Sequence, residues 1–147
     1  MRDHDDVAVT EFAHLLRMTI SFHPAVRNYR DLIVWQKGVA LAVEAYRFAE
    51  RLPRWEQYGL KSQILRASVS VPSNIAEGHG RHSRGDYVRH LCYSRGSLSE
   101  LDTLLYVASE VGHTSHSDAN TAYVLLDEIG RMLWAMMTNL GKKPFYF

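Results

Sequence analysis

The chain has 147 residues, of which 46% are hydrophobic and 22% are charged, a composition typical of one folded domain with its own core. The single cysteine, Cys92, excludes an internal disulfide and fits a reducing compartment. No apolar run approaches the roughly 20 residues that a membrane span needs. The N-terminal stretch MRDHDDVAVTEFAH has three aspartates, whereas an export signal needs positive charge there. We therefore expect a cytoplasmic protein with no membrane partner.

Residues 1–28 are predicted to form an N-terminal extension, partly disordered or in a short helix, outside the main domain. Within it, the segment VAVTEFAHLLRM places four apolar side chains on one face of a helix: Val9, Phe12, Leu15 and Leu16. The stretch HPAV that follows would break this helix, because proline cannot donate a backbone hydrogen bond.

The first helix of the main domain is predicted from about residue 31 to Leu52, because Pro53 disfavours helical geometry in the residue before it. Apolar residues recur every three or four positions, as a core-facing stripe requires: Trp35, Val39, Ala42, Tyr46 and Ala49. Other apolar residues fall outside the predicted core stripes and are expected on the surface, where they would mediate self-association: Val34, Leu41, Phe48, Leu125 and Met132.

The next segment, residues 59–78, contains the ambiguous stretch SVSVPSNIAEG. Its first four residues alternate polar and apolar as a strand does, and the proline that follows is typical of a turn. An apolar stripe nevertheless continues through the segment at helical spacing: Leu60, Ile64, Ala67, Val71, Ile75 and Gly78. We therefore predict one helix, kinked because Pro72 cannot donate to the Ser68 carbonyl. The Ser68 and Ser70 hydroxyls are expected to satisfy the loosened backbone, and Asn74 to find a hydrogen-bond partner near the helix seam.

Two further helices follow with near-heptad spacing of apolar residues. The stripe of the third helix is Tyr87, Leu91, Ser94, Leu98, Leu101, Leu105 and Ala108. The stripe of the fourth is Ala122, Leu126, Ile129, Leu133, Met136 and Leu140. Ser83 is predicted to cap the third helix and Gly112 to end it, while Ser117 or Asp118 caps the fourth and Gly141 ends it.

Short connections make consecutive helices antiparallel. The sequence thus predicts an all-α protein, an antiparallel up-down four-helix bundle with a proline-kinked second helix, over residues 29–142. Residues 143–147 are predicted to be a C-terminal tail.

Charge is distributed unevenly, although the net charge is only +1. Residues 59–95 contain six Lys and Arg against two acidic residues, whereas residues 96–130 contain six acidic residues and no Lys or Arg. Three interpretations are open: solvated helix faces, ion pairing between subunits, or phosphate binding, for which the planar fork of arginine is suited. The candidate nucleic-acid-binding residues are Lys61, Arg66, Arg81, Arg84, Arg89, Arg95, Lys142 and Lys143.

Signals of catalysis and of metal binding are few. Ser97 follows a glycine but lies in mid-helix, without the strand–turn–helix setting of a nucleophile elbow. Two His-x-x-His pairs occur, His79 with His82 and His113 with His116, and no third ligand stands in register with them. We expect neither enzymatic activity nor a metal or other cofactor.

Four stretches show a family resemblance: YRDLIVWQKGVALA, LPRWEQYGLKSQILRASVSVPSNIAEGHGR, GSLSELDTLLYVASEVG and LLDEIGRMLWAMMTNL. They resemble the bacterial four-helix-bundle proteins encoded in intervening sequences of 23S ribosomal RNA genes, and the similarity covers residues 29–142. The most specific stretch is VSVPSNIAEG. The resemblance implies a four-helix bundle with a proline-bearing helix, and the structural motif that it points to is Pro72, Ser73, Asn74, Glu77 and Gly78.

The resemblance also implies partners. One relative, the accessory variability determinant of diversity-generating retroelements, is a basic homopentamer that binds nucleic acid and a reverse transcriptase. This chain departs from the basic relatives in its near-neutral charge. We expect a non-enzymatic homo-oligomeric scaffold or interaction protein, in particular a pentamer, with a partner protein such as a reverse transcriptase. The alternative is sequence-independent RNA or DNA binding through an arginine cluster, Arg81, Arg84 and Arg89, summed over the subunits of a ring.

Overall fold

The structure is a computed structural model, and it describes residues 26–140. Between these residues the chain contains four α-helices, three short 3-10 helices and no strand, which confirms the predicted all-α class. The α-helices are α2 (Ile33–Ala49), α3 (Leu60–His79), α4 (Arg84–Glu110) and α5 (Asn120–Asn139). The 3-10 helices are η1 (Tyr29–Asp31), η2 (Arg54–Tyr58) and η3 (His116–Ala119). The predicted end of the last helix at Gly141, most of the N-terminal extension and the predicted C-terminal tail lie outside the described residues.

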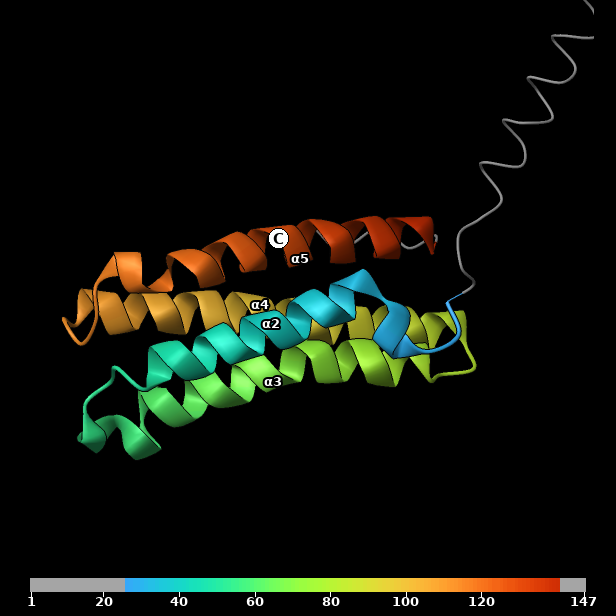
Figure 1. Ribbon diagram of the computed structural model, residues 1–147. Coiled ribbons are helices and arrows are strands. Elements are labelled where there is room, and N and C mark those ends of the chain that lie inside the picture. The colour runs from blue at the N-terminus through green and yellow to red at the C-terminus, as the bar shows by residue number, and fades with distance from the viewer. Residues whose placement is uncertain (1–25, 141–147) are drawn as a thin grey trace, which may run out of the picture.

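The four α-helices lie side by side (Figure 1). Each contacts the helix before it and the helix after it along the chain, and α2 also contacts α5, so that the four enclose one core. The most extensive of these contacts joins α3 to α4. None of the helices described between residues 26 and 140 is long and apolar enough to cross a bilayer.

The predicted apolar stripes of α3, α4 and α5 face the core. Their central members are fully buried: Ile64, Val71, Ile75, Leu91, Leu101, Leu105, Ile129 and Leu133. One detail differs in the last turns of α5, where Met137 is fully buried and Met136 only partly. A helix of 3.6 residues per turn drifts against a strict seven-residue repeat, which accounts for this shift by one position.

The prediction of which face of α2 packs against the core was wrong. Val34, Leu41 and Phe48, expected on the surface, are buried in the core, whereas Val39 and Tyr46, expected in the core, are exposed. Of the predicted stripe only the final alanine is fully buried. Both faces of this helix are apolar, so periodicity alone could not decide which one packs inward. The other two residues expected on the surface are half-buried against the core: Leu125 and Met132.

The ambiguous stretch is helical throughout. Helix α3 continues through Pro72 without interruption, which confirms the prediction of one helix. Pro72 is buried against Gly38 of α2, where a Cβ placed on the glycine would lie 3.2 Å from the proline Cβ. Helices α2 and α3 therefore approach closely at this point, because the proline ring of α3 packs against a glycine of α2, which has no side chain.

On its other side, α3 meets α4 as closely. A Cβ placed on Gly78 would lie 2.8 Å from both the Cβ of His90 and the Cδ2 of Tyr87. Such distances are well inside van der Waals contact, so position 78 has no room for a side chain. The glycine predicted to end this helix thus also sets the spacing between α3 and α4.

The helix ends agree with the predicted caps in part. The Ser83 side chain accepts a hydrogen bond from the Asp86 backbone N–H at the start of α4, and Gly112, with a φ of 82°, follows the end of that helix. The fourth helix differs. Ser115 and Asp118 form a reciprocal capping box on η3, and α5 begins after it at Asn120 without a side-chain cap. Helix α2 ends at Ala49, three residues before the predicted Leu52.

Glu56 ties the far end of the bundle together. Its carboxylate accepts a hydrogen bond from the Leu60 backbone N–H at 2.9 Å and lies 3.0 Å from Nε2 of His113. These two bonds, that from Leu60 foremost, hold the pKa of Glu56 below its usual range. The loop before α3 is thereby fastened to the loop after α4.

We predict that Gly78→Ala lowers the free energy of unfolding by about 1–3 kcal/mol, the usual cost of overpacking. Gly96→Ala is the matched control, because a Cβ there would meet no atom within 4 Å. It lies inside α4 and should raise stability by up to about 1 kcal/mol through helix propensity. Urea unfolding followed by circular dichroism measures both. Equal effects of the two substitutions would contradict the assignment of close contact to position 78.

Candidate functional site

The turns of α3 on both sides of Pro72 receive hydrogen bonds from their own side chains. The Ser68 hydroxyl donates to the Leu65 carbonyl at 2.8 Å, and the Ser73 hydroxyl donates to the Val69 carbonyl at 2.8 Å. These side-chain donors supplement a helix in which the proline nitrogen cannot donate.

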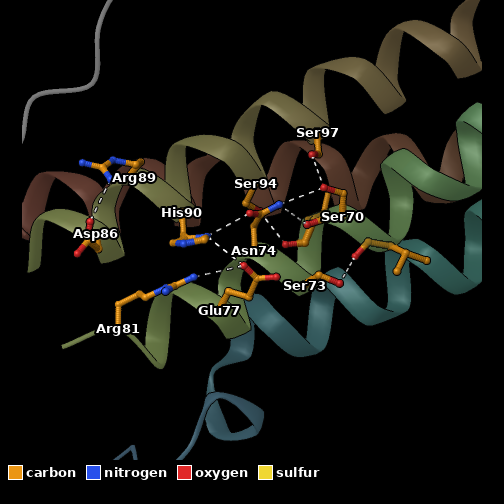
Figure 2. Close-up of polar contacts among 12 residues, drawn as sticks. Ser70, Ser73, Asn74, Glu77, Arg81, Asp86, Arg89, His90, Ser94 and Ser97 are labelled. Carbon is orange, nitrogen blue, oxygen red and sulfur yellow. Dashed lines mark hydrogen bonds and ion pairs between the residues drawn. The ribbon is translucent and has the colours of Figure 1, made fainter. Parts of the chain in front are cut away.

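A polar seam, formed by Ser70, Asn74, His90, Ser94 and Ser97, joins this part of α3 to α4 (Figure 2). Asn74 Nδ2 donates to the carbonyl and the hydroxyl of Ser70, at 2.9 and 3.0 Å, and its Oδ1 lies 3.3 Å from Nδ1 of His90. The Ser97 hydroxyl donates to the Ser70 hydroxyl at 2.8 Å. The buried Ser94 hydroxyl donates to the Val71 carbonyl at 2.9 Å. The amide thus has the hydrogen-bond partners expected from the sequence.

The outer end of the seam is charged (Figure 2). Glu77 Oε2 lies 3.6 Å from Nδ1 of His90 and 3.9 Å from Nη2 of Arg81. Nη1 of Arg89 lies 3.2 Å from Asp86. The pKa of Asp86 is lowered, chiefly by the hydrogen bond from Ser83 and further by the positive charges of Arg89 and Arg81. The predicted motif residues from Pro72 to Gly78 are therefore engaged mainly with α2, with α4 and with one another.

Three arginines of the predicted nucleic-acid-binding set lie near the α3–α4 turn: Arg81, Arg84 and Arg89. Both Arg81 and Arg89 act on the same carboxylate, that of Asp86. Arg84 Nη2 donates to the Asn139 carbonyl at 3.0 Å, where the last carbonyls of α5 need donors. Each arginine of this cluster thus has a hydrogen-bond or ion-pair partner within its own chain.

The remaining predicted basic residues lie elsewhere. Lys61 pairs with Glu50 at 3.2 Å at the opposite end of α3 from the arginine cluster, about 27 Å away along the helix. Arg66 is exposed on α3, and the Arg95 guanidinium stands 5.7 Å from the centre of the Trp134 ring. Two members lie outside the described residues: Lys142 and Lys143. The described members do not form one continuous patch.

The acidic segment is largely paired within the chain. Three of the six carboxylates of residues 96–130 form intrachain ion pairs: Asp118 with Arg51, Asp127 with Arg131 and Glu128 with Lys37. A fourth, Glu110, lies 2.7 Å from Nε2 of His116. Much of the charge asymmetry of the sequence is therefore balanced within one subunit, by residues that lie outside the 59–95 segment.

The histidine pairs do not assemble with further ligands. In the described part of the chain, no group of three or more His, Cys, Asp or Glu side chains is placed to hold a metal ion. The second pair is occupied by carboxylates: His113 Nε2 lies 3.0 Å from Glu56, and His116 Nε2 lies 2.7 Å from Glu110.

An apolar face, which the sequence pattern did not predict to be exposed, lies between α2 and α3. It surrounds a groove of about 530 Å³ that is lined mainly by Val39, Val43, Tyr46, Val69 and Pro72. We call these residues the α2–α3 face. The first three recur at positions i, i+4 and i+7, and two of them, Val39 and Tyr46, belong to the stripe that was predicted to face the core. A second and more polar groove of about 330 Å³ lies between α4 and α5.

The second groove contains an unusual hydroxyl. Among the described residues, Tyr123 has the only buried side-chain N or O atom without a hydrogen-bond partner. Its pKa is raised, first by burial and then by the nearby carboxylate of Asp102. The two grooves therefore differ in chemistry: one is apolar, and the other is lined by both polar and apolar residues.

The model of the 23S rRNA-intervening sequence protein family matches residues 30–135, well over half of the chain. The chain belongs to this family. A crystal structure of a protein of unknown function from the S23 ribosomal protein family of Bacteroides thetaiotaomicron aligns with a TM-score of 0.66. The sequence identity is 21%, over 71% of this chain and 98% of that one, so this likeness shows the fold alone. No curated protein matches the chain.

In this 23S rRNA-intervening sequence protein, the polar seam predicts a specific loss of stability. Asn74→Ala removes two donated bonds and leaves His90 without its amide neighbour, so we expect a loss of about 1–3 kcal/mol. Ser73→Ala is the matched control, because it removes one exposed bond to the backbone and should cost no more than about 1 kcal/mol. Urea unfolding at pH 7 measures both. A loss no larger for Asn74→Ala than for the control would count against the seam.

Proposed function

We propose that this protein is a non-enzymatic, self-associating scaffold of the cytoplasm, which assembles into a homo-oligomer through the α2–α3 face. The pentamer of the relative named in the sequence analysis is the expected state, with a partner protein such as a reverse transcriptase bound to the assembly. The observation that supports self-association is the exposure of apolar side chains on neighbouring helices: Val39 at 37%, Val43 at 45%, Tyr46 at 50% and Val69 at 43%. Contiguous apolar surface of this kind marks interaction sites.

The chemistry of the polar seam favours a scaffold over an enzyme. Asn74, Glu77 and His90 hydrogen-bond or pair with other residues of the same chain, and the Ser97 hydroxyl donates to another hydroxyl rather than to a base. A serine nucleophile needs a neighbouring general base. The most distinctive polar residues of the sequence thus have a structural use.

The arrangement of the helices completes the proposal. We propose that the four helices run alternately up and down and that α3 bends at Pro72, because a proline within a helix favours a bend. Pro72 lines the groove of the α2–α3 face. A bend at this residue would therefore shape the surface through which copies associate.

We predict that the wild-type protein has a solution mass several times the 16.9 kDa of one chain at micromolar concentration. Val43→Asp should reduce that mass to the monomer, because it places a carboxylate in an apolar interface. Val124→Asp is the matched control, since Val124 is an exposed valine of α5 outside the α2–α3 face, and it should leave the mass unchanged. Light scattering after nuclease treatment measures all three. A monomeric wild type would overturn the proposed function.

A second candidate function is sequence-independent binding of RNA or DNA by the arginine cluster. It is favoured by the grouping of three arginines near one turn, two of which act on the same carboxylate. Their intrachain partners must be exchanged for phosphate, and the net charge is only +1. We therefore expect binding near the micromolar end of non-specific affinities.

A salt titration tests the second function. The logarithm of the affinity should fall with that of the salt concentration, with a slope of about 0.7–0.9 for each phosphate neutralised. Arg89→Ala should weaken binding and reduce this slope. Arg131→Ala should change neither; it is the control because Arg131 is likewise exposed and paired with a carboxylate on its own helix. Absence of binding at low salt, or equal effects of both variants, would leave self-association as the function.

A further inference from the structure

The α2–α3 face surrounds an apolar groove at the surface. Its apolar residues come from two adjacent helices, and Val39, Val43 and Tyr46 extend over seven positions of α2. Amphipathic helices bind such grooves through anchors spaced i, i+3, i+4 and i+7. Seven positions of a helix measure about 10 Å.

One segment of this chain outside the described residues has the matching pattern. Val9, Phe12 and Leu16 stand at i, i+3 and i+7, and Leu15 shares their face. As a helix, this segment would also extend over about 10 Å. We call residues 9–16 the N-terminal segment. Its anchors are equal in extent to the apolar part of α2 that they would meet.

The charges of the two surfaces are complementary. Residues 1–16 contain four acidic residues and one arginine. Residues 33–76, which include α2 and most of α3, contain six Lys and Arg against three acidic residues. Arg47 lines the groove and is paired with Glu44. Lys61 is paired with Glu50. Opposite charges at the rim of an apolar contact favour encounter and fix orientation.

The connection between the segment and the bundle is long enough. The described chain begins at Val26, and η1, just after it, contacts both α2 and α3, the two helices that form the face. Residues 17–25 can extend over about 30 Å. The segment can therefore reach the α2–α3 face of its own subunit or of a neighbouring one.

We infer that the N-terminal segment of one copy binds as a helix in the α2–α3 face of a second copy. This inference rests on the proposed self-association, because a segment that filled the groove of its own subunit would cover the face through which copies associate. Exchange in one direction makes a head-to-tail contact, which closes into a ring when the rotation between subunits permits.

Cross-linking tests the contact directly. In full-length protein carrying Cys92→Ser, which removes the exposed native thiol, Phe12→Cys is combined with Val43→Cys. Mild oxidation should then give disulfide-linked dimers and larger species on a non-reducing gel, because a disulfide forms only between nearby Cβ atoms. His14→Cys with Val43→Cys is the control, since in a helix His14 would lie on the face opposite the apolar anchors, and it should cross-link at least tenfold less.

Two cross-linking results would overturn the inference. A cross-link confined to single chains would place the segment on its own subunit, and equal cross-linking of the two pairs would show no fixed contact. The mass of Phe12→Asp, with His14→Asp as its control, separates this inference from the proposed function. If Val43→Asp dissociates the oligomer and Phe12→Asp does not, self-association stands and the N-terminal segment is not its link. If the wild type is already monomeric, the proposed function itself fails.

Discussion

The close approach of α3 to both of its neighbours is the constraint on which the rest of the fold depends. On one side the Pro72 ring packs on Gly38 of α2, and on the other Gly78 leaves no space against α4. Backbones this close leave little room for water, so the polar groups between them need partners within the protein. The seam of serine hydroxyls, one amide and one imidazole supplies these partners. The stretch VSVPSNIAEG therefore sets the distances from α3 to α2 and to α4.

The residues of the polar seam are distinct from those of the α2–α3 face. The residues engaged in the seam lie between α3 and α4, where Ser94 is buried and the others are partly buried, whereas the apolar residues of the α2–α3 face lie on the outer surface of those two helices. Most carboxylates of residues 96–130 are likewise engaged within the chain, each beside a Lys, Arg or His side chain. The groove between α2 and α3 is therefore the part of this surface whose lining is mainly apolar.

Much of the fold could be predicted from the sequence because α3, α4 and α5 each have a long apolar stripe with near-heptad spacing, and that stripe faces the core. In α3 that stripe continued through Pro72 and so outweighed the local signals of a strand and a turn. Helix α2 could not be predicted in the same way, because both of its faces are apolar; the fit of Gly38 to Pro72 favours one of them, and this is tertiary information. The partners within the seam, such as Asn74 and His90, are sixteen positions apart, and helical periodicity is silent about pairs between helices.

The contact between Gly38 and Pro72 also bears on how such a sequence can diverge. The two positions are far apart in the chain yet share one small volume, so neither can drift independently of the other. A side chain acquired at position 38 would require the backbone at position 72 to move away, and the surface groove that Pro72 lines would change with it. A substitution of the internal Gly38 would thus change the shape of the outer surface.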